Sequence, residues 1–291
     1  MSIFDIFKRN KTSEEKTASP KPEAMEETID RTKETDTPGT TPSTDAPESM
    51  AKVAPKNVGK LDMVIAFDTT GSMAQYIGAV RAEVAELIPQ LFQDNEDLRL
   101  GIVAFGDYCD MKNPQEFGDA YQVIHPTDNL DDLINFVRYS KNTHGGDQDE
   151  FYELVIKKIV EETEWRKGST RSVLLIADAN PHPTGYTYQR NVIDNQIDWQ
   201  KEAAKAAENK IKIDTVSIHP LPWLKRLSAM TNGVSVPFKT GSKTADLMRA
   251  SVMARGSMQA RRKFDSMMES CSDEEIKAVY RSYKKERDSF D

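Results

Sequence analysis

The sequence predicts an α/β fold in which helices flank a doubly wound, mostly parallel central sheet. Continuous apolar runs such as LDMVIAF (61–67) are typical of strands that are covered on both faces. Apolar residues at spacings of three and four, as over 77–91, are typical of amphipathic helices. The two patterns alternate between residues 61 and 255, and this alternation favours a parallel sheet with helices on both sides.

The same patterns predict each element in turn. We expect strands at 61–67, 98–108, 120–125, 171–179, 210–219 and 233–238, and helices at 77–91, 128–141, 148–165, 198–210, 223–231 and 243–256. The strand at 120–125 is short and suits a sheet edge. Either Asp128 or Asn129 can cap the helix that follows it, because both side chains accept hydrogen bonds from free backbone N–H groups.

The two ends of the chain differ from this middle part. Residues 10–60 are rich in Thr, Glu, Lys, Pro and Ser, and we expect them to be disordered because they cannot bury enough apolar surface. Residues 1–9 form a short apolar peptide. We favour a frayed chain start there over a docking peptide or a weak membrane-surface helix. Residues 256–291 predict a charged helical tail without a core-facing stripe.

Charge and cysteine content limit the possible functions. The net charge is −8, and the acidic excess lies in residues 61–240, with 27 acidic and 18 basic side chains. Such a domain disfavours nucleic acid as a ligand and suits cations or basic partners. Two distant cysteines, Cys109 and Cys271, favour a reducing compartment. Neither a signal peptide nor a membrane-spanning run is visible, so we expect a soluble, cytoplasmic protein.

Polar motifs follow the predicted strands at places where ligands collect in open α/β sheets. The first, DTTGSM, begins at Asp68, and its alternating oxygens on Asp68, Thr70 and Ser72 can converge on one point. Carboxylate and hydroxyl oxygens suit Mg²⁺, Ca²⁺ or Mn²⁺. Asp147 in THGGDQDE and Asp178 in DANPHP can join them from other loops. A bound dication would relieve the repulsion between such carboxylates.

With these motifs the chain resembles the von Willebrand factor A domains over about residues 61–255. Their metal-ion-dependent adhesion site has an Asp-x-Ser-x-Ser run after the first strand, a Thr in a later loop and an Asp after the fourth strand. The resemblance implies that Asp68, Thr70, Ser72 and Asp178 bind a divalent cation. Mg²⁺ is the ion we expect, with Ca²⁺ or Mn²⁺ as alternatives.

The later loop departs from that pattern, because Gly-Gly-Asp replaces Gly-Gly-Thr. D-x-T-G-S-M, G-G-D-x-x-E and D-x-x-P-H together resemble a branch found in intracellular bacterial proteins and beside some atypical kinases. Asp147 is then the expected loop ligand, with Glu150 nearby and Thr143 as an alternative. Asp107 belongs either to the outer shell of the site or to a cap or surface ion pair. A third aspartate would hold the metal firmly but weaken its attraction for an acidic partner.

Two loop histidines, His182 and His144, are interpreted as structural residues that bond to backbone. ARGSMQARRKF (254–264) gathers basic side chains that could bind phosphates, although a solvated helix is the simpler interpretation.

The function predicted from these features is a non-catalytic, divalent-cation-dependent module that binds or scaffolds a protein partner. The alternative is a Mg²⁺-dependent phosphohydrolase or phosphotransferase with Asp68 as nucleophile, because D-x-T-G-S also resembles the nucleophile loop of haloacid-dehalogenase-type enzymes. Those enzymes need a lysine and a late acidic motif. GDYCD (106–110) comes too early in the chain, and no lysine follows Asp178 at a suitable strand end.

Overall fold

The computed structural model describes most of the chain beyond the N-terminal segment. The described residues are 59–112, 116–188, 193–194, 196–238 and 242–288. Compact units divide the chain at Lys52, and the described residues all lie in the unit Val53–Asp291. The expectations for residues 1–9, and for 10–60 apart from its last two residues, therefore fall outside the described part of the chain.

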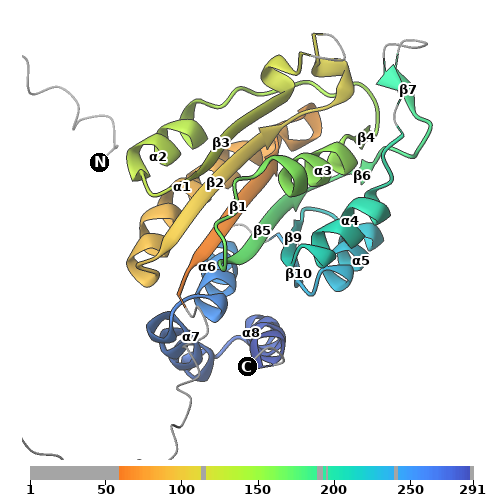
Figure 1. Ribbon diagram of the computed structural model, residues 1–291. Helices are drawn as coiled ribbons and strands as arrows, with labels where there is room; N and C mark the ends of the chain where they lie inside the picture. The colour runs from red at the N-terminus through yellow and green to blue at the C-terminus, as the bar shows by residue number, and fades with distance from the viewer. Residues whose placement is uncertain (1–58, 113–115, 189–192, 195, 239–241, 289–291) are drawn as a thin grey trace, which may run out of the picture. The chain divides into compact units, whose positions relative to one another are not determined.

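A six-stranded sheet is the centre of this unit, with the order β10-β9-β5-β1-β2-β3 (Figure 1). Its strands are β1 (Leu61–Asp68), β2 (Leu98–Phe105), β3 (Tyr121–Thr127), β5 (Thr170–Ala177), β9 (Ile211–Ser217) and β10 (Ser235–Pro237). Every pairing is parallel except that of β3, which lies antiparallel to β2 at the sheet edge. The predicted α/β class with a mostly parallel sheet is confirmed.

Helices cover both faces of the sheet (Figure 1). One face carries α1 (Ile77–Asp94), α2 (Leu130–Tyr139) and α6 (Ser242–Arg255), and the other carries α3 (Tyr152–Glu162), α4 (Trp199–Glu208) and α5 (Pro222–Met230). Short 3₁₀ helices span Gly71–Gln75, Tyr108–Asp110 and Gly118–Ala120. None of the helices in the described ranges combines the length and the apolar character needed to cross a bilayer.

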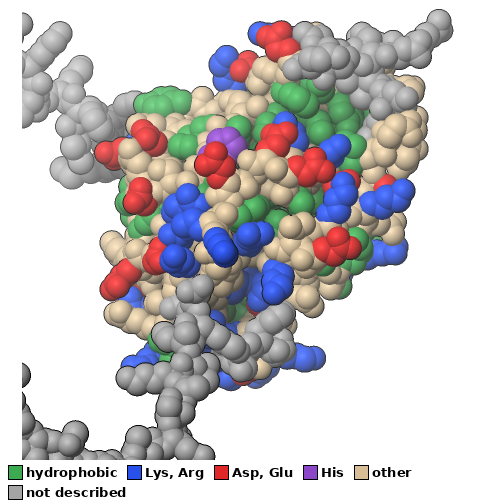
Figure 2. All heavy atoms as spheres, in the orientation of Figure 1, with side chains coloured by type: hydrophobic (Ala, Val, Ile, Leu, Met, Phe, Trp, Pro, Cys, Tyr) green, Lys and Arg blue, Asp and Glu red, His purple; other side chains and the backbone are tan. Residues whose placement is uncertain are grey.

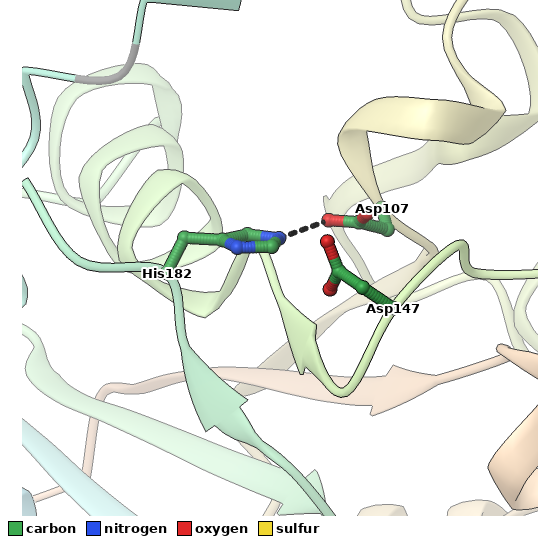
Figure 3. Close-up of side chains that lie close together, drawn as sticks. All are labelled: Asp107, Asp147 and His182. Atoms are coloured by element: carbon green, nitrogen blue, oxygen red, sulfur yellow. Dashed lines mark hydrogen bonds and ion pairs between the residues drawn. The ribbon is translucent and has the colours of Figure 1, made fainter. Parts of the chain in front are cut away.

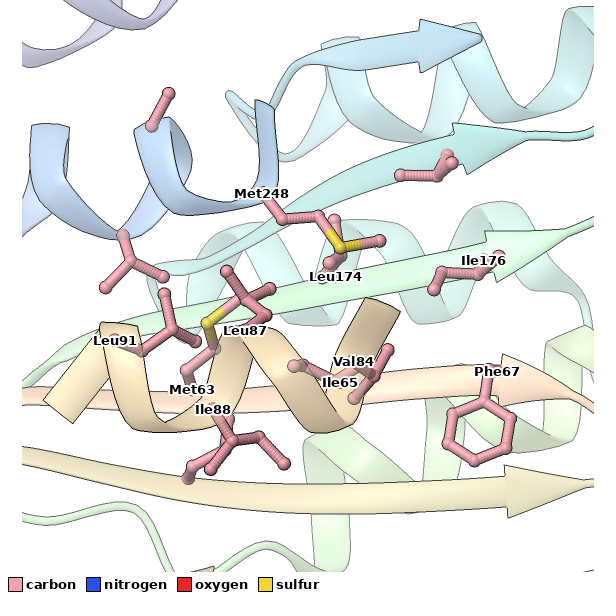
Figure 4. Close-up of a cluster of buried hydrophobic side chains, with 14 of the residues drawn as sticks. Met63, Ile65, Phe67, Val84, Leu87, Ile88, Leu91, Leu174, Ile176 and Met248 are labelled. Atoms are coloured by element: carbon pink, nitrogen blue, oxygen red, sulfur yellow. The ribbon is translucent and has the colours of Figure 1, made fainter. Parts of the chain in front are cut away.

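The apolar run of β1 has a direct structural reason. Met63, Ile65 and Phe67 pack on the α1 side of the sheet (Figure 4). Val64 and Ala66 pack on the opposite side, against residues of α3 and its neighbours. Because successive strand residues point to opposite faces, a strand covered on both sides must be apolar at every position.

The helix predicted over 148–165 begins later than expected, at Tyr152. Residues Asp149–Glu150 form a short strand, β4, that pairs in parallel with β6 (Asn180–Pro181). The remaining short strands are β7 (Thr187–Tyr188) and β8 (Ile193–Asp194), which pair with each other. The helical pattern did not reveal β4, because a pairing with a distant loop leaves no periodicity in the sequence. The pairing of β4 with β6 holds the loop before α3 against the loop after β5.

The C-terminal tail packs into the core, and the expectation that it lacks a core-facing stripe was wrong. It forms α7 (Met258–Ser270) and α8 (Glu274–Asp288). Phe264 of α7 and Tyr280 and Tyr283 of α8 are buried and join the apolar cluster on the α1 and α6 face. These few aromatic residues are diluted by charged neighbours, which hides the stripe in the sequence.

Part of the basic stretch 254–264 serves this packing. The Arg255 side chain is buried and forms a bidentate ion pair with Asp214 of β9, with N···O distances of 2.5 and 2.9 Å. Its guanidinium also pairs with Glu286 of α8 at 3.1 Å, and Lys263 pairs with Asp94 of α1 at 3.1 Å. The face seen in Figure 2 carries both signs of charge, with Lys and Arg gathered toward its lower half. The net acidity is therefore not spread evenly over that face.

Candidate metal centre

The carboxylates singled out by the motifs lie at one edge of the sheet. Asp68 is the last residue of β1, Asp178 follows β5, and Asp107 lies just beyond β2. Strand β1 lies between β5 and β2, and the chain passes from β1 to β2 on one side and returns to β5 on the other. Strand order reverses at such a position and leaves a crevice at the carboxyl ends. The topology therefore brings these three loops together.

The first run of oxygens is held by short hydrogen bonds. Oδ1 of Asp68 accepts from the backbone N–H of Thr70 at 2.7 Å and from its hydroxyl at 2.6 Å. The Thr70 and Ser72 hydroxyls lie 3.2 Å apart. The Gly71 N–H donates to the His144 carbonyl at 3.1 Å, and a Cβ at Gly71 would lie 2.9 Å from that oxygen. Only glycine permits this close approach of the two loops.

Tyr152, at the start of α3, connects the two aspartates. Its hydroxyl donates to Oδ2 of Asp68 at 2.5 Å and accepts from the backbone N–H groups of Asp178 and Ala179 at 3.3 and 3.4 Å. Tyr152 is completely buried. No sequence pattern points to Tyr152, because a tyrosine at a helix start carries no motif and lies 84 positions from Asp68.

Three carboxyl groups crowd this buried position. Asp68 is 0% exposed, Glu150 3% and Asp178 8%. Burial and the negative charge of Asp178 raise the pKa of Asp68 to about 7, although hydrogen bonds from Thr70 and Tyr152 act in the opposite direction. Burial, with the charges of Asp68 and Asp107, raises the pKa of Glu150 to about 10.

Oxygens at this position also lack partners. Oδ1 of Asp178 and Oε2 of Glu150 are buried without a hydrogen bond from any described residue. Within the described ranges, no lysine or arginine forms an ion pair with Asp68, Glu150 or Asp178. Buried polar atoms are normally satisfied and buried charges are normally paired. A set of hard oxygen donors with these deficits fits a divalent cation such as Mg²⁺ or Ca²⁺.

Residues 143–150, which contain Gly145 and Gly146 and are called the glycine loop below, contribute Glu150 to this group. A Cβ at Gly145, which has φ of 65°, would lie 2.8 Å from Oε1 of Glu150 and 3.4 Å from Cβ of Thr70. Thr143 is buried, but its hydroxyl lies 3.0 Å from that of Thr69. The pairing of β4 with β6 sets Glu150 opposite Pro181, in the loop that also carries Asp178.

Asp147 lies in a neighbouring cluster. Its side chain is exposed, and its Oδ2 accepts from the Tyr186 hydroxyl at 2.8 Å. One oxygen each of Asp147 and Asp107 and one ring nitrogen of His182 lie within 4.8 Å of one another (Figure 3). Among the described contacts, those of the Asp147 side chain with other segments are with this neighbouring cluster.

The histidines differ from their sequence interpretation. His182 is 1% exposed, and its Nε2 lies 2.7 Å from Oδ1 of Asp107, so its ring is bonded to a carboxylate rather than to backbone. Burial alone would lower the pKa of His182, but the hydrogen bond with Asp107 and the charge of its carboxylate raise it. The exposed ring of His144 lies 3.8 Å from Asp110.

A known protein family matches more than half of the chain. The model of the von Willebrand factor type A domain family matches residues 62–246. The ariadne-like RING finger protein R811 of Acanthamoeba polyphaga mimivirus is 24% identical over 139 residues, which are 48% of this chain and 12% of that protein. The chain therefore spans only a small part of that relative. The crystal structure of the SpRpn10 VWA domain is similar over 65% of this chain and 94% of its own, with 16% identity and a TM-score of 0.45.

Proposed function

Because this chain belongs to the von Willebrand factor type A domain family, we propose that it is a non-catalytic module that binds or scaffolds a protein partner and depends on a divalent cation. Domains of this family are typically interaction modules. The observation that carries the proposal is the buried group of Asp68, Asp178 and Glu150, in which two carboxyl oxygens have no partner among the described residues.

Each residue of this group has a separate role in the proposal. Asp68 and Asp178 supply the negative charge that holds the cation, and the hydroxyls of Thr70 and Ser72 add neutral oxygens. Glu150 takes the place in the glycine loop where adhesion-type domains have a hydroxyl. All of these donors are hard oxygens, so Mg²⁺ is the ion we favour, with Ca²⁺ or Mn²⁺ as alternatives.

The charge balance of the site limits the chemistry of the partner. The bound cation would supply an open coordination position for one oxygen of the partner. Three ionised carboxylates around a dication leave a net charge of about −1, which opposes a further carboxylate. We therefore propose a partner that contributes a neutral oxygen, such as a hydroxyl or an amide carbonyl.

We also propose that the protein is cytoplasmic, because the free cysteines Cys109 and Cys271 suit a reducing compartment.

The test compares partner capture and cation binding in the same variants. Full-length wild type, Asp68→Ala and the exposed control Asp119→Ala are used as baits in Mg²⁺ and in EDTA, and Mg²⁺ affinity is measured by calorimetry. We expect EDTA and Asp68→Ala to remove the same captured proteins, and Asp68→Ala to abolish Mg²⁺ binding. Identical captured proteins under all conditions, with Mg²⁺ bound only by wild type and the control, would reduce the cation to a structural role.

The phosphohydrolase alternative requires a separate assay. Both carboxylate oxygens of Asp68 accept hydrogen bonds, and the residue is fully buried, which does not favour its attack on a phosphoryl group. We expect no hydrolysis of an aryl phosphate in Mg²⁺. Turnover by wild type that Asp68→Asn abolishes would replace the binding proposal with the enzymatic one.

A further inference from the structure

We propose that Asp107, Asp147 and His182 form a second cation site, which binds a metal ion with affinity for imidazole. Zn²⁺ is the ion used to test it. One donor atom from each residue lies within 4.8 Å of the others (Figure 3). Imidazole nitrogen suits zinc and similar metals, whereas Mg²⁺ and Ca²⁺ prefer oxygen alone. The site is therefore chemically distinct from the all-oxygen group around Asp68.

The fold brings the three donors together from separate segments. Asp107 follows β2, Asp147 precedes β4 in the glycine loop, and His182 follows β6. The parallel pairing of β4 with β6 holds the second and third of these segments side by side. The backbone N–H of His182 also donates to Oε2 of Glu153 in α3 at 3.1 Å, which fixes the position of the histidine.

The bond between Asp107 and His182 does not satisfy all the polar atoms of these two buried side chains. Asp107 is 0% exposed, and its Oδ1 bonds to His182. The Asp110 backbone N–H and the Cys109 thiol also lie beside this carboxylate, but neither forms a hydrogen bond of good geometry with its Oδ2. Nδ1 of His182, which is 1% exposed, also lacks a hydrogen-bond partner within the described part of the chain. A buried carboxylate oxygen left without a donor is costly. A metal ion beside the Asp107 carboxylate would remove that deficit.

Tyr186 contacts and orients two of the proposed ligands, Asp147 and His182. Its hydroxyl donates to Oδ2 of Asp147 at 2.8 Å, and its ring stacks on that of His182 with centroids 3.7 Å apart. The Asp147 carboxylate points toward the bond between Asp107 and His182 (Figure 3). Bonds of about 2 Å to zinc need donor atoms no more than about 4 Å apart, and the exposed Asp147 side chain is free to adjust to that spacing. Supporting contacts of this kind are usual around metal ligands.

The experiment measures two metals separately on the metal-stripped full-length protein. Zn²⁺ affinity is obtained by competition with a chromophoric chelator, and Mg²⁺ affinity by calorimetry. We expect His182→Gln to weaken Zn²⁺ binding at least tenfold and to change Mg²⁺ binding less than twofold. Asp68→Ala should do the reverse, so failure of the Zn²⁺ result and failure of the proposed function are distinguishable. Tyr186→Phe, which keeps all ligands, should weaken Zn²⁺ binding by a smaller factor.

X-ray absorption on wild type loaded with one equivalent of Zn²⁺ supplies a readout that needs no variant. We expect scattering from one imidazole in the zinc shell. An oxygen-only shell, the absence of Zn²⁺ binding, or equal Zn²⁺ affinity in wild type and a folded His182→Gln would overturn the second site. Folding of each variant is checked by thermal unfolding in EDTA.

Discussion

Replacing Asp68 by Asn should stabilise the metal-free protein at pH 7.5 and remove its response to Mg²⁺. The Asp68 carboxyl is fully buried, and burial with the neighbouring charge of Asp178 raises its pKa from an ordinary 3.8 to about 7. The unfolded chain therefore releases this proton at lower pH than the folded protein does. The free energy of unfolding of wild type therefore decreases as the pH rises from about 4 to 7, because the folded protein keeps the Asp68 proton over this range and the unfolded chain does not. Asn cannot ionise, so the variant escapes this loss.

The magnitude follows from the pKa difference. Each unit corresponds to about 1.4 kcal/mol, so the penalty on wild type is about 2 kcal/mol at pH 5.5 and about 4 kcal/mol at pH 7.5. Asn also perturbs the hydrogen bond from Tyr152, which costs about 1–3 kcal/mol at every pH. The pH-dependent part is therefore the diagnostic quantity. The stability of Asp68→Asn relative to wild type should rise by about 2 kcal/mol between the two pH values.

Urea unfolding in EDTA at both pH values provides the measurement, with Asp119→Asn as an exposed control. Mg²⁺ at about 100 times its Kd should then add about 2.7 kcal/mol to wild type and to the control, and nothing to Asp68→Asn. A difference between Asp68→Asn and wild type that does not change with pH would refute the argument from burial. Equal Mg²⁺ stabilisation of wild type and Asp68→Asn would refute the assignment of Asp68 to the cation site.

Two further predictions concern residues that the sequence did not single out. Tyr152→Phe removes a buried hydroxyl that bonds to Asp68 and to two backbone N–H groups, so we expect a loss of about 2–3 kcal/mol in urea unfolding and weaker Mg²⁺ binding by calorimetry. Phe264→Ala should lower the free energy of unfolding by about 3–5 kcal/mol, whereas the exposed Met258→Ala should change it little. If Phe264→Ala unfolds like wild type, α7 is not part of the core.

The element pattern and much of the candidate site could be predicted because both rest on local chemistry. A strand such as β1, covered on both faces, requires an unbroken apolar run, and the turn after it places Asp68, Thr70 and Ser72 within a few residues of one another. The alternation of strands and helices then indicates a parallel sheet, whose carboxyl ends collect Asp68 and Asp178. These inferences need only neighbouring residues and one rule of topology.

The glycine loop shows where such reasoning stops. Asp147 and Glu150 both follow Gly145 and Gly146, and either could have faced Asp68. Glu150 lies in β4, pairs with β6 and is buried, whereas Asp147 is exposed and accepts from the Tyr186 hydroxyl. The packing of α7 and α8 was hidden for a related reason, because a few aromatic residues among many charged ones become a core face only when a partner surface is present.

By itself, then, the sequence determined the α/β class and the motif that follows β1. Only the tertiary structure decided that Tyr152 connects Asp68 with Asp178, that Glu150 joins their buried group, and that His182 bonds to Asp107. Backbone preferences and apolar periodicity act between residues close in the chain. Whether distant side chains meet in one buried site depends instead on how segments tens of residues apart pack together. Short-range sequence patterns contain no information about that packing.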